Sequence, residues 1–407
     1  MTLKKRSWLA VIACAIAIFN SGALFFGYPG LMSAEWQDMF NVTSSETGLI
    51  MTFACIGVGV LMFLSGSIHM RIGTRKCLII GSVILIADMV IANLATNIYH
   101  AYIWAFLCGA GNGFIYGPGV STVQEWVPKH KGLGSGILNL AFGTAAAIMS
   151  PVYKWMLSSF GYKNMNWIII GMIVLLTGIS LSFAELPKFS KLSDEVNSQL
   201  EEEKREVASK RKLEGGFMTP GQALRTKGFW ALWLSWAFVG AAGISMVSLS
   251  VKYAVSIELA SVTVLTAFNL TNGISRFFAG TISDYLGRNK TCMLAFAIGA
   301  IGYFALPFLR SLILVAIAAA FVGFAFGTLF AATAPRISEL FGMKYYSMLL
   351  ALVFSGYGLV GGIAGPAFSG LLLNKSGGNY TLVFIVLGVF CVLGVIAISQ
   401  ANPSKKK

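Results

Sequence analysis

Three polar side chains share one face of an apolar stretch that spans roughly residues 259–282. Asn269, Asn272 and Arg276 stand at i, i+3 and i+7, so a helix places them on the same side. A guanidinium stays charged at any physiological pH. Burying it in hydrocarbon costs at least about 2.5–3.5 kcal/mol, so such a residue normally faces a water-filled cavity or a partner. The pattern therefore favours an anion-binding site at Arg276 over an arginine neutralised by a fixed internal carboxylate.

Other polar and aromatic residues lie deep in further apolar stretches. Asn112 and Tyr116 are four residues apart and share a helix face. Phe330 lies among small residues, where it could line a cavity or simply pack, and Tyr357 lies about 20 Å along its helix from Lys344. We expect these four residues to join the asparagines around Arg276 as substrate-binding candidates.

Asp88 is the one acidic residue that lies as deep as Arg276. It falls within the apolar stretch 77–97, about 18 Å from the expected cytoplasmic end of its helix. It is a candidate for carrying a proton. The alternative, which we weight more heavily, is a carboxyl group that hydrogen-bonds to neighbouring helices.

These residues require a membrane-embedded scaffold to position them. The chain has 407 residues, of which 56% are hydrophobic and 11% charged, and this excludes an ordinary soluble protein. The apolar stretches are long, contain glycine and lack period-two alternation, so we expect α-helices rather than a barrel. Twelve stretches are long enough to span a bilayer, at residues 8–32, 48–68, 77–97, 101–124, 133–157, 166–184, 228–251, 259–282, 291–309, 312–334, 346–373 and 381–400.

The cysteine and histidine positions argue against catalysis and metal binding. All six cysteines fall in or beside apolar stretches without metal-ligand spacing, and the three histidines lie near membrane edges. No clustered catalytic groups and no phosphate-binding loop are present in the sequence. We therefore expect no metal, no cofactor, no enzymatic activity and no ATP-driven pump.

The net charge of +14 is better explained by orientation than by nucleic-acid binding. Fifteen lysines and arginines lie in the short segments on one side of the expected helices, and five lie on the other. By the positive-inside rule, both termini face the cytoplasm. We expect a multi-pass protein of the cell membrane that contacts the lipid bilayer and not nucleic acid.

Two similar loops indicate an internal repeat. Residues 66–76 and 280–290 each end a helix, carry a glycine seven residues on, at Gly73 and Gly287, and continue into a basic cluster. The offset is 214 residues, and each loop follows the second helix of six. We predict two six-helix halves, at residues 1–184 and 228–407, joined by a mixed-charge cytoplasmic linker at 185–227.

The second loop resembles the cytoplasmic signature of the major facilitator superfamily, G-x-x-x-D-x-x-G-R-x-K. The resemblance implies a twelve-helix, two-half fold and a conformational latch at Gly280, Asp284, Gly287 and Arg288. The first loop departs from the signature because Met70 stands at the acidic position. By analogy with this family, we expect a monomer.

More specific segments resemble the oxalate–formate antiporter branch, which is related to the monocarboxylate transporters. They are GAGNGFIYG at residue 109 onward with EWVPKHKGLGSG after it, and NGISRFFAGTISDYLGR around Arg276. In the oxalate exchanger a second cationic residue, a lysine, aligns with Tyr357. A site with one buried cation is a better match for a ligand with one carboxylate than for a ligand with two.

The leading hypothesis is therefore a secondary transporter for small monocarboxylates such as L-lactate or pyruvate, coupled to a proton. An oxalate/formate-type carboxylate antiporter is the alternative. A transporter-like sensor, which would bind its ligand without moving it, is the second alternative.

Overall fold

The structure is a computed structural model that describes residues 2–190, 194–210, 218–259, 261–342 and 345–402. A few helical side chains, that of Asp284 among them, lie outside this description. All regular secondary structure in the described residues is helical, which confirms the predicted all-α class. Inside a bilayer no water is present to pair backbone groups, so a chain this apolar pairs them within helices.

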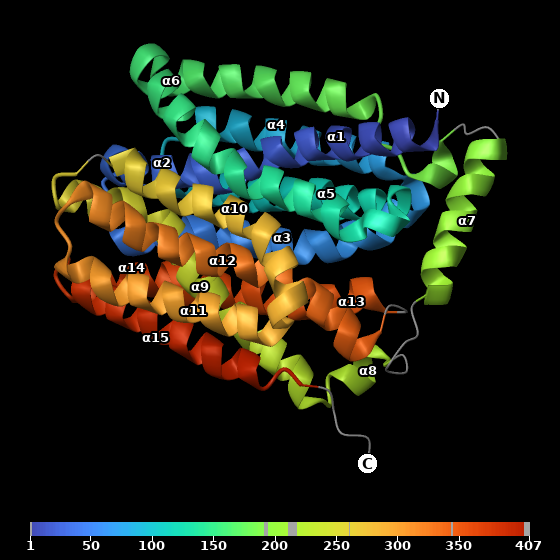
Figure 1. The fold of residues 1–407 in the computed structure, drawn as a ribbon. Coiled ribbons are helices and arrows are strands. Elements are labelled where there is room, and N and C mark those ends of the chain that lie inside the picture. Colours follow the sequence, from blue (N-terminus) through green and yellow to red (C-terminus); the bar gives the residue numbers. More distant parts are fainter. Residues whose placement is uncertain (1, 191–193, 211–217, 260, 343–344, 403–407) are drawn as a thin grey trace.

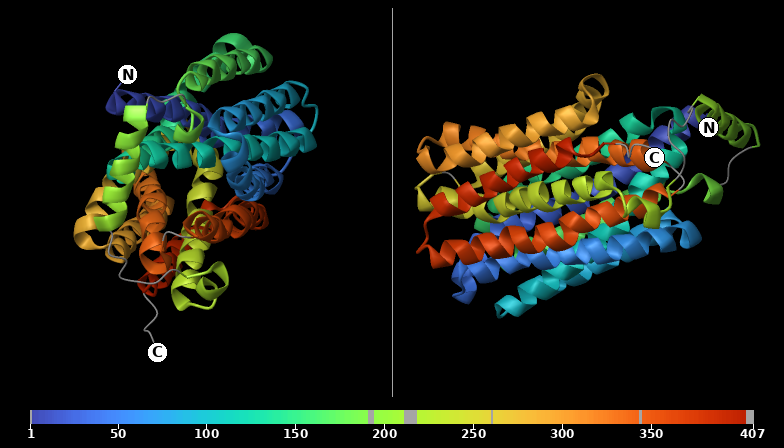
Figure 2. Two further views of the ribbon diagram at one scale, coloured as in Figure 1. Left: turned by 90° about the vertical axis from the view of Figure 1, so that its right-hand side faces the viewer. Right: turned by 90° about the horizontal axis from the view of Figure 1, so that it is seen from below.

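The long helices run side by side in two groups (Figures 1 and 2). The N-terminal group contains α1 (Leu3–Gly22), the π-helical η1 (Ala23–Gly27), α2 (Tyr28–Phe40), α3 (Ser44–Ile72), α4 (Thr74–Asn93), α5 (Ile98–Trp126) and α6 (Lys131–Leu181). The C-terminal group contains α9 (Lys227–Ser256), α10 (Ser261–Leu286), α11 (Arg288–Ala305), α12 (Leu312–Phe341), α13 (Tyr346–Ser355), the π-helical η5 (Gly356–Gly361) and η6 (Ile363–Ala367), α14 (Phe368–Lys375) and α15 (Tyr380–Ser399). The remaining elements are α7 (Asp194–Lys210), α8 (Pro220–Ala223) and the short η2 (Pro128–His130), η3 (Pro187–Phe189) and η4 (Leu306–Phe308).

The helices account for the twelve predicted spans. α6 contains two of them, because the chain turns within it (Figure 1). The turn is at Gly161, whose φ of 75° is a value that glycine adopts readily. The predicted interruption at Gly27 is a π-helical segment, through which the first span continues from α1 into α2. Nine helical segments of the described chain are long and apolar enough to cross a membrane, and α5 and α10 are not among them. These two more polar helices carry most of the expected site residues.

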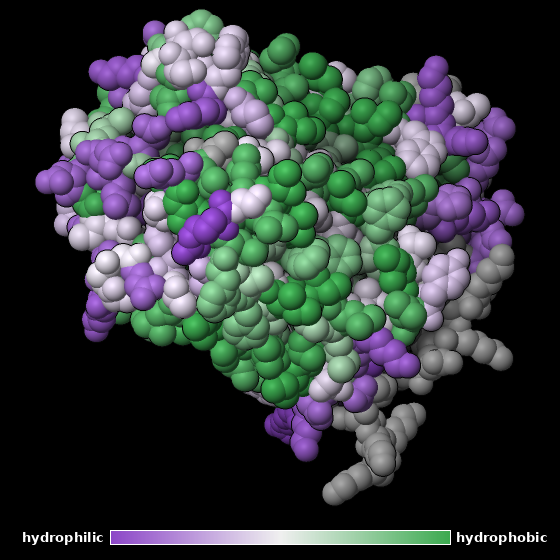
Figure 3. All heavy atoms as spheres, turned by 60° about the vertical axis from the view of Figure 1, so that its left-hand side comes forward, coloured by the Kyte–Doolittle hydropathy of each residue, from purple (hydrophilic) through white to green (hydrophobic). Residues whose placement is uncertain are grey.

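The two ends of the helix bundle differ. Both termini, α7 and α8 lie at one end, which we call the linker end, and α2 and α14 reach the opposite, far end (Figure 1). On the face shown in Figure 3, hydrophobic side chains cover the middle of the molecule and hydrophilic side chains gather toward its two ends. This is the surface of a multi-pass membrane protein, because lipid chains cover exposed apolar side chains without cost.

The predicted linker contains a docked helix. Val196 and Leu200 of α7 pack against Leu3, Ala10 and Trp126 of the N-terminal group. An ion pair of 3.1 Å joins Lys204 of α7 to Glu125 at the end of α5. α7 is therefore held against the N-terminal group, within the segment that we expected to be a mixed-charge linker.

The repeated loops share a backbone conformation. Gly73 joins α3 to α4 with φ 84° and ψ 169°, and Gly287 joins α10 to α11 with φ 86° and ψ 144°. A side chain rarely adopts such positive φ values, so glycine is required at both turns. This similarity supports the predicted repeat, whereas the limits of the halves at residues 184 and 228 stay predictions.

Glycines on α5 allow close packing against α3. A Cβ added to Gly109 would overlap the carbonyl oxygen of Ala54, and one added to Gly113 would lie 2.8 Å from the amide nitrogen of Met62. Small residues at such contacts let two backbones approach, which is a main source of helix association in membranes.

We predict that Gly109→Ala destabilises the protein by about 1–3 kcal/mol, because the methyl group has no space against the α3 backbone. Gly171→Ala on α6 is the matched control, since its Cβ would meet nothing within 4 Å. Thermal unfolding of the two purified variants measures the difference. Equal melting temperatures would contradict the tight α3–α5 contact.

Candidate functional site

Arg276 lies on α10 with only 2% of its surface exposed. Its Nε donates a hydrogen bond to Oδ1 of Asn272 at 3.2 Å, one helical turn away. Its terminal nitrogens Nη1 and Nη2 have no hydrogen-bond partner in the described part of the chain. No described carboxylate pairs with it, so the alternative of a fixed internal counter-ion receives no support from the described residues.

Two aromatic rings flank the guanidinium, one from each helix group. The Arg276 Cζ lies 3.9 Å from the ring centroid of Phe330 on α12 and 5.2 Å from that of Phe142 on α6. A ring face attracts a cation, and the attraction is worth about 2 kcal/mol when both partners are desolvated. Close to this point Gly143 of α6 and Gly273 of α10 bring the two backbones together, with a Cβ on Gly143 only 2.5 Å from the Gly273 Cα. Arg276 therefore lies where the two groups meet.

The C-terminal side of the site is an aromatic wall. The Tyr357 ring centroid lies 5.6 Å from that of Phe330 and 6.1 Å from that of Phe326. The indole of Trp236 completes the wall at 4.8 Å from Phe330, and its Nε1 donates to Thr333 at 3.0 Å. Tyr357 is 1% exposed, and its hydroxyl has no hydrogen-bond partner within the described residues.

The N-terminal group contributes Tyr116 through α5. Its hydroxyl donates to Oδ1 of Asn139 on α6 at 2.6 Å, and its ring lies 4.9 Å from that of Phe142. Tyr116 thus reaches the same aromatic cluster as Arg276. Asn112, one turn earlier, accepts a hydrogen bond from Ser21 at 3.0 Å and is committed to the contact with α1.

Several buried polar groups near Arg276 have no hydrogen-bond partner among the residues that the structure describes. They are Nη1 and Nη2 of Arg276, Nδ2 of Asn272, the Tyr357 hydroxyl and, on the same face of α10, both amide atoms of Asn269. Buried polar atoms are paired in the great majority of cases, and leaving one unpaired costs about 1–3 kcal/mol. Most of these groups are donors, so an acceptor-rich, negatively charged ligand fits the arrangement.

The structure does not bring Asp88 to this cluster. Asp88 lies on α4, is fully buried and faces the Cys108 thiol of α5. Its surroundings belong to the interior of the N-terminal group, where α4 packs on α5 and α6. Of the sequence-predicted candidates, Arg276, Asn272, Tyr116, Phe330 and Tyr357 share one region, Asn269 and Asn112 lie at its edges, and Asp88 lies apart.

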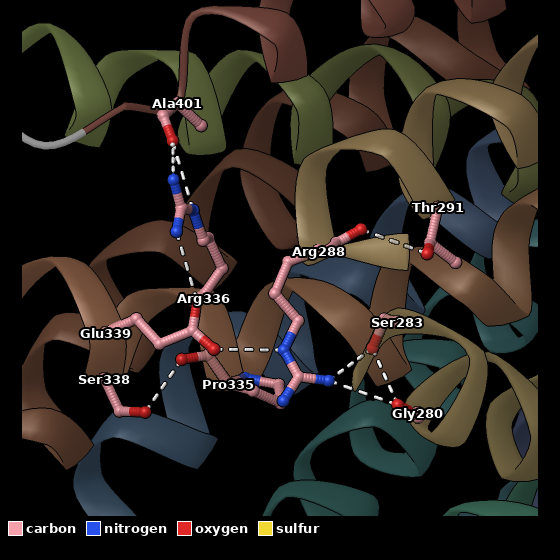
Figure 4. Close-up of polar contacts among 10 residues, drawn as sticks. Gly280, Ser283, Arg288, Thr291, Pro335, Arg336, Ser338, Glu339 and Ala401 are labelled. Carbon is pink, nitrogen blue, oxygen red and sulfur yellow. Dashed lines mark hydrogen bonds and ion pairs between the residues drawn. The ribbon is translucent and has the colours of Figure 1, made fainter. Parts of the chain in front are cut away.

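Two residues of the predicted conformational latch, Gly280 and Arg288, take part in the polar contacts drawn in Figure 4. Arg288 donates through Nε to Oε1 of Glu339 on α12 at 3.0 Å and through Nη1 to the Gly280 carbonyl oxygen at 3.1 Å. Glu339 also pairs with Arg336 at 3.1 Å, and Arg336 donates to the Ala401 carbonyl oxygen at 2.7 Å. These contacts join α10, α11, α12 and the end of α15. Asp284 is part of α10, but its side chain lies outside the described residues.

The N-terminal group has a corresponding set of contacts built from different residues. Glu185, which follows α6, pairs with Arg75 at 3.2 Å and with Arg6 at 3.7 Å. Arg75 also donates to the carbonyl oxygens of Leu181 and Ser182. A carboxylate beyond the sixth span therefore provides an ion-pair centre in the half whose loop carries Met70 at the acidic position.

Sequence reasoning missed three contributors to these sites. Phe142 and Asn139 lie in a stretch that we treated only as a span, although an amide and an aromatic residue three positions apart beside Gly143 were a usable signal. Glu339 lies 51 residues from Arg288, and a single sequence gives no indication of that pairing.

Comparison with known proteins identifies a family to which the chain is similar. The model of the Major Facilitator Superfamily matches residues 10–262 and 229–407, which together cover nearly all of the chain. The two matched ranges overlap at residues 229–262.

Individual relatives are distant. The oxalate:formate antiporter of Oxalobacter formigenes is 28% identical over 286 residues, which cover 68% of this chain and 63% of the antiporter. An uncharacterized 38 kDa protein of Thermoproteus tenax is 24% identical over 96% of this chain and 95% of its own length. Monocarboxylate transporter 13 of Rattus norvegicus is 21% identical over 43% of this chain and 39% of the transporter. The match thus spans less than two thirds of the antiporter and of the monocarboxylate transporter.

Proposed function

The chain belongs to the Major Facilitator Superfamily, and we propose that it is a secondary transporter that moves small monocarboxylates such as L-lactate or pyruvate across the membrane together with a proton. The observation that carries this proposal is the buried guanidinium of Arg276, whose two terminal nitrogens face no partner among the described residues. The names of two relatives, an oxalate:formate antiporter and a monocarboxylate transporter, support a carboxylate as the substrate.

The site offers a carboxylate two sets of hydrogen-bond donors, the planar guanidinium of Arg276 and the polar groups around it. Nη1 and Nη2 of Arg276 form the two-pronged donor that matches two carboxylate oxygens. Nδ2 of Asn272 and the Tyr357 hydroxyl are further unpaired donors, and Tyr116 approaches from the N-terminal group. The substrate therefore contacts both groups, as a transporter that alternates access between two sides of the membrane requires.

The aromatic wall favours one carboxylate over two. Phe330 lies against the guanidinium, and Phe326, Trp236 and Tyr357 pack around Phe330, so a substrate at Arg276 would have ring surfaces beside it. A second carboxylate placed there would lose its water without a cationic partner, which is costly. A short apolar tail, such as the methyl group of lactate, fits these surfaces.

We predict that Arg276→Lys abolishes most lactate uptake in proteoliposomes, because an ammonium cannot make the two parallel hydrogen bonds of a guanidinium. The matched control is Arg225→Lys, which changes an exposed arginine beyond α8. Thermal unfolding shows whether each variant is folded. Near-normal uptake by a folded Arg276→Lys variant would refute the site.

We predict that Tyr357→Lys shifts selectivity toward oxalate or another short dicarboxylate, because it adds a second cation to the aromatic wall. Competition of each acid against labelled lactate uptake measures the shift. Tyr357→Phe serves as the control for loss of the hydroxyl alone. Wild-type protein that already exchanges oxalate better than lactate would contradict the monocarboxylate assignment.

Charge balance supports coupling to a proton. An empty site leaves the Arg276 charge uncompensated by any described carboxylate, and a bound substrate anion neutralises it. A proton that travels with the carboxylate makes the transported pair neutral. Asp88 lies apart from the substrate position, so we propose that the proton moves with the substrate or with water beside Arg276 rather than through Asp88.

The pH inside proteoliposomes during lactate entry tests the coupling. We predict acidification of the lumen that follows uptake and persists in Asp88→Asn, because the Asp88 carboxyl is outside the substrate site. If a folded Asp88→Asn variant lost both lactate uptake and lumenal acidification, Asp88 would instead be the proton carrier.

A carboxylate exchanger is the second candidate, and the similarity to the oxalate:formate antiporter favours it. An exchanger requires a second carboxylate on the opposite side of the membrane and moves no protons. Uptake that depends on internal carboxylate without a pH change would establish exchange, whereas binding without uptake or exchange would indicate a sensor.

We further propose that the linker end faces the cytoplasm and that the protein acts as a monomer in the cell membrane. The excess of lysine and arginine in the short segments at that end supports the orientation.

A further inference from the structure

A closely packed seam joins the two groups at the far end of the molecule. It consists of residues 44–55 of α3 against residues 362–370 of the C-terminal group. A Cβ on Gly370 would lie 2.5 Å from the Ser44 carbonyl oxygen, and one on Gly48 would overlap that of Pro366. Thr52 donates a hydrogen bond to the Gly362 carbonyl oxygen at 2.6 Å. The far-end seam is therefore closed in this structure, with backbone against backbone.

A second buried cation lies at this seam. Lys252, near the end of α9, is 8% exposed, and its Nζ donates to Oγ1 of Thr47 on α3, which is 1% exposed. The bond joins residues 205 positions apart, one from each group. Lys252 is one of the five basic residues that the charge pattern places on the side opposite the cytoplasm, so its burial is not apparent from the sequence.

The chemistry of this pair opposes closure more than it supports it. An ammonium has three donors and is strongly hydrated, and removing it from water is expensive unless several acceptors replace that water. In the described structure Nζ has one hydrogen-bond partner, a neutral hydroxyl, and the Asp38 carboxylate of α2 attracts the ammonium without bonding to it. Replacing a buried ion by an apolar side chain of similar size is often neutral or stabilising, whereas removing its only partner is strongly destabilising.

We propose that Lys252 biases the far-end seam toward opening, because its ammonium is dehydrated only while the seam is closed, and that Thr47 limits this bias by accepting its hydrogen bond. The inference rests on the proposed transport cycle, in which the far-end seam opens and closes. It identifies a residue that sets the balance between the two states without contacting the substrate.

A native cysteine reports on the seam. Cys55 of α3 is fully buried, and a Cβ on Gly362 would overlap it. It becomes reactive toward a small methanethiosulfonate reagent only when the seam opens. Cys391 of α15, also buried, lies within the C-terminal group and reacts only on unfolding, so it is the internal control. Mass spectrometry of the digested full-length protein measures both labelling rates without any substrate.

The two partners have opposite predicted effects. Thr47→Val leaves the ammonium buried without its acceptor, so the Cys55 labelling rate rises about tenfold. Lys252→Met removes the buried charge, so the rate falls below that of the wild type. In Thr47→Val/Lys252→Met the rate stays near that of Lys252→Met, because the acceptor is no longer needed. Thr47→Ser, which keeps the hydroxyl, and Lys375→Met, which changes an exposed lysine of the same end, behave as wild type.

Each other result overturns the proposal. A higher Cys55 rate in Lys252→Met would mean that the lysine simply holds the seam closed. An unchanged rate in both single variants would mean that the pair is irrelevant to opening, and no labelling in any variant would mean that the seam does not open. A wrong substrate assignment changes none of these rates, so failure of this inference is distinguishable from failure of the proposed function.

Discussion

A charged guanidinium without a described counter-ion, held inside an apolar helix bundle, is the constraint on which this structure depends. The Arg276 guanidinium does not lose its proton, and no described carboxylate lies beside it to neutralise its charge. Instead one amide oxygen, from Asn272, and two ring faces, from Phe330 and Phe142, surround it. These contacts hold the side chain in place but leave two of its nitrogens unpaired. This arrangement is the basis for our proposal that an anion completes the site.

Two of the spans that border this site contain π-helical segments, whereas α10, which carries Arg276, is an uninterrupted α-helix. The first span contains π-helical η1 and the eleventh contains η5 and η6, and Tyr357 lies within η5. π-helical segments shift the register of the hydrogen bonds and occur frequently at functional sites. The spans at the outside of each group, such as α4, α11 and α15, are regular α-helices. Irregular backbone is therefore concentrated where the two groups touch each other.

The sequence predicted the fold, and it singled out Arg276 as the centre of the candidate site, for clear physical reasons. Hydropathy determines spans, and an arginine on the same helix face as two asparagines is conspicuous in a stretch that lipid would otherwise surround. What it could not predict depends on contacts between distant segments. Phe142 gains its role only when α6 meets α10, and Glu339 only when α12 meets α11. Lys252 looks like a membrane-edge charge until packing against α3 buries it.

The two buried cations differ in how their burial is compensated, and this difference assigns them different roles. Arg276 is weakly hydrated for a cation and is flanked by rings, so it tolerates a dry site and gains most when a carboxylate enters. Lys252 has a compact, strongly hydrated charge and a hydroxyl partner, so it gains most when its surroundings open to water. In the proposed transport cycle, one cation therefore responds to the substrate and the other to the state of the seam. Because they lie on neighbouring helices of one group, α10 and α9, a single rigid movement of that group changes the surroundings of both.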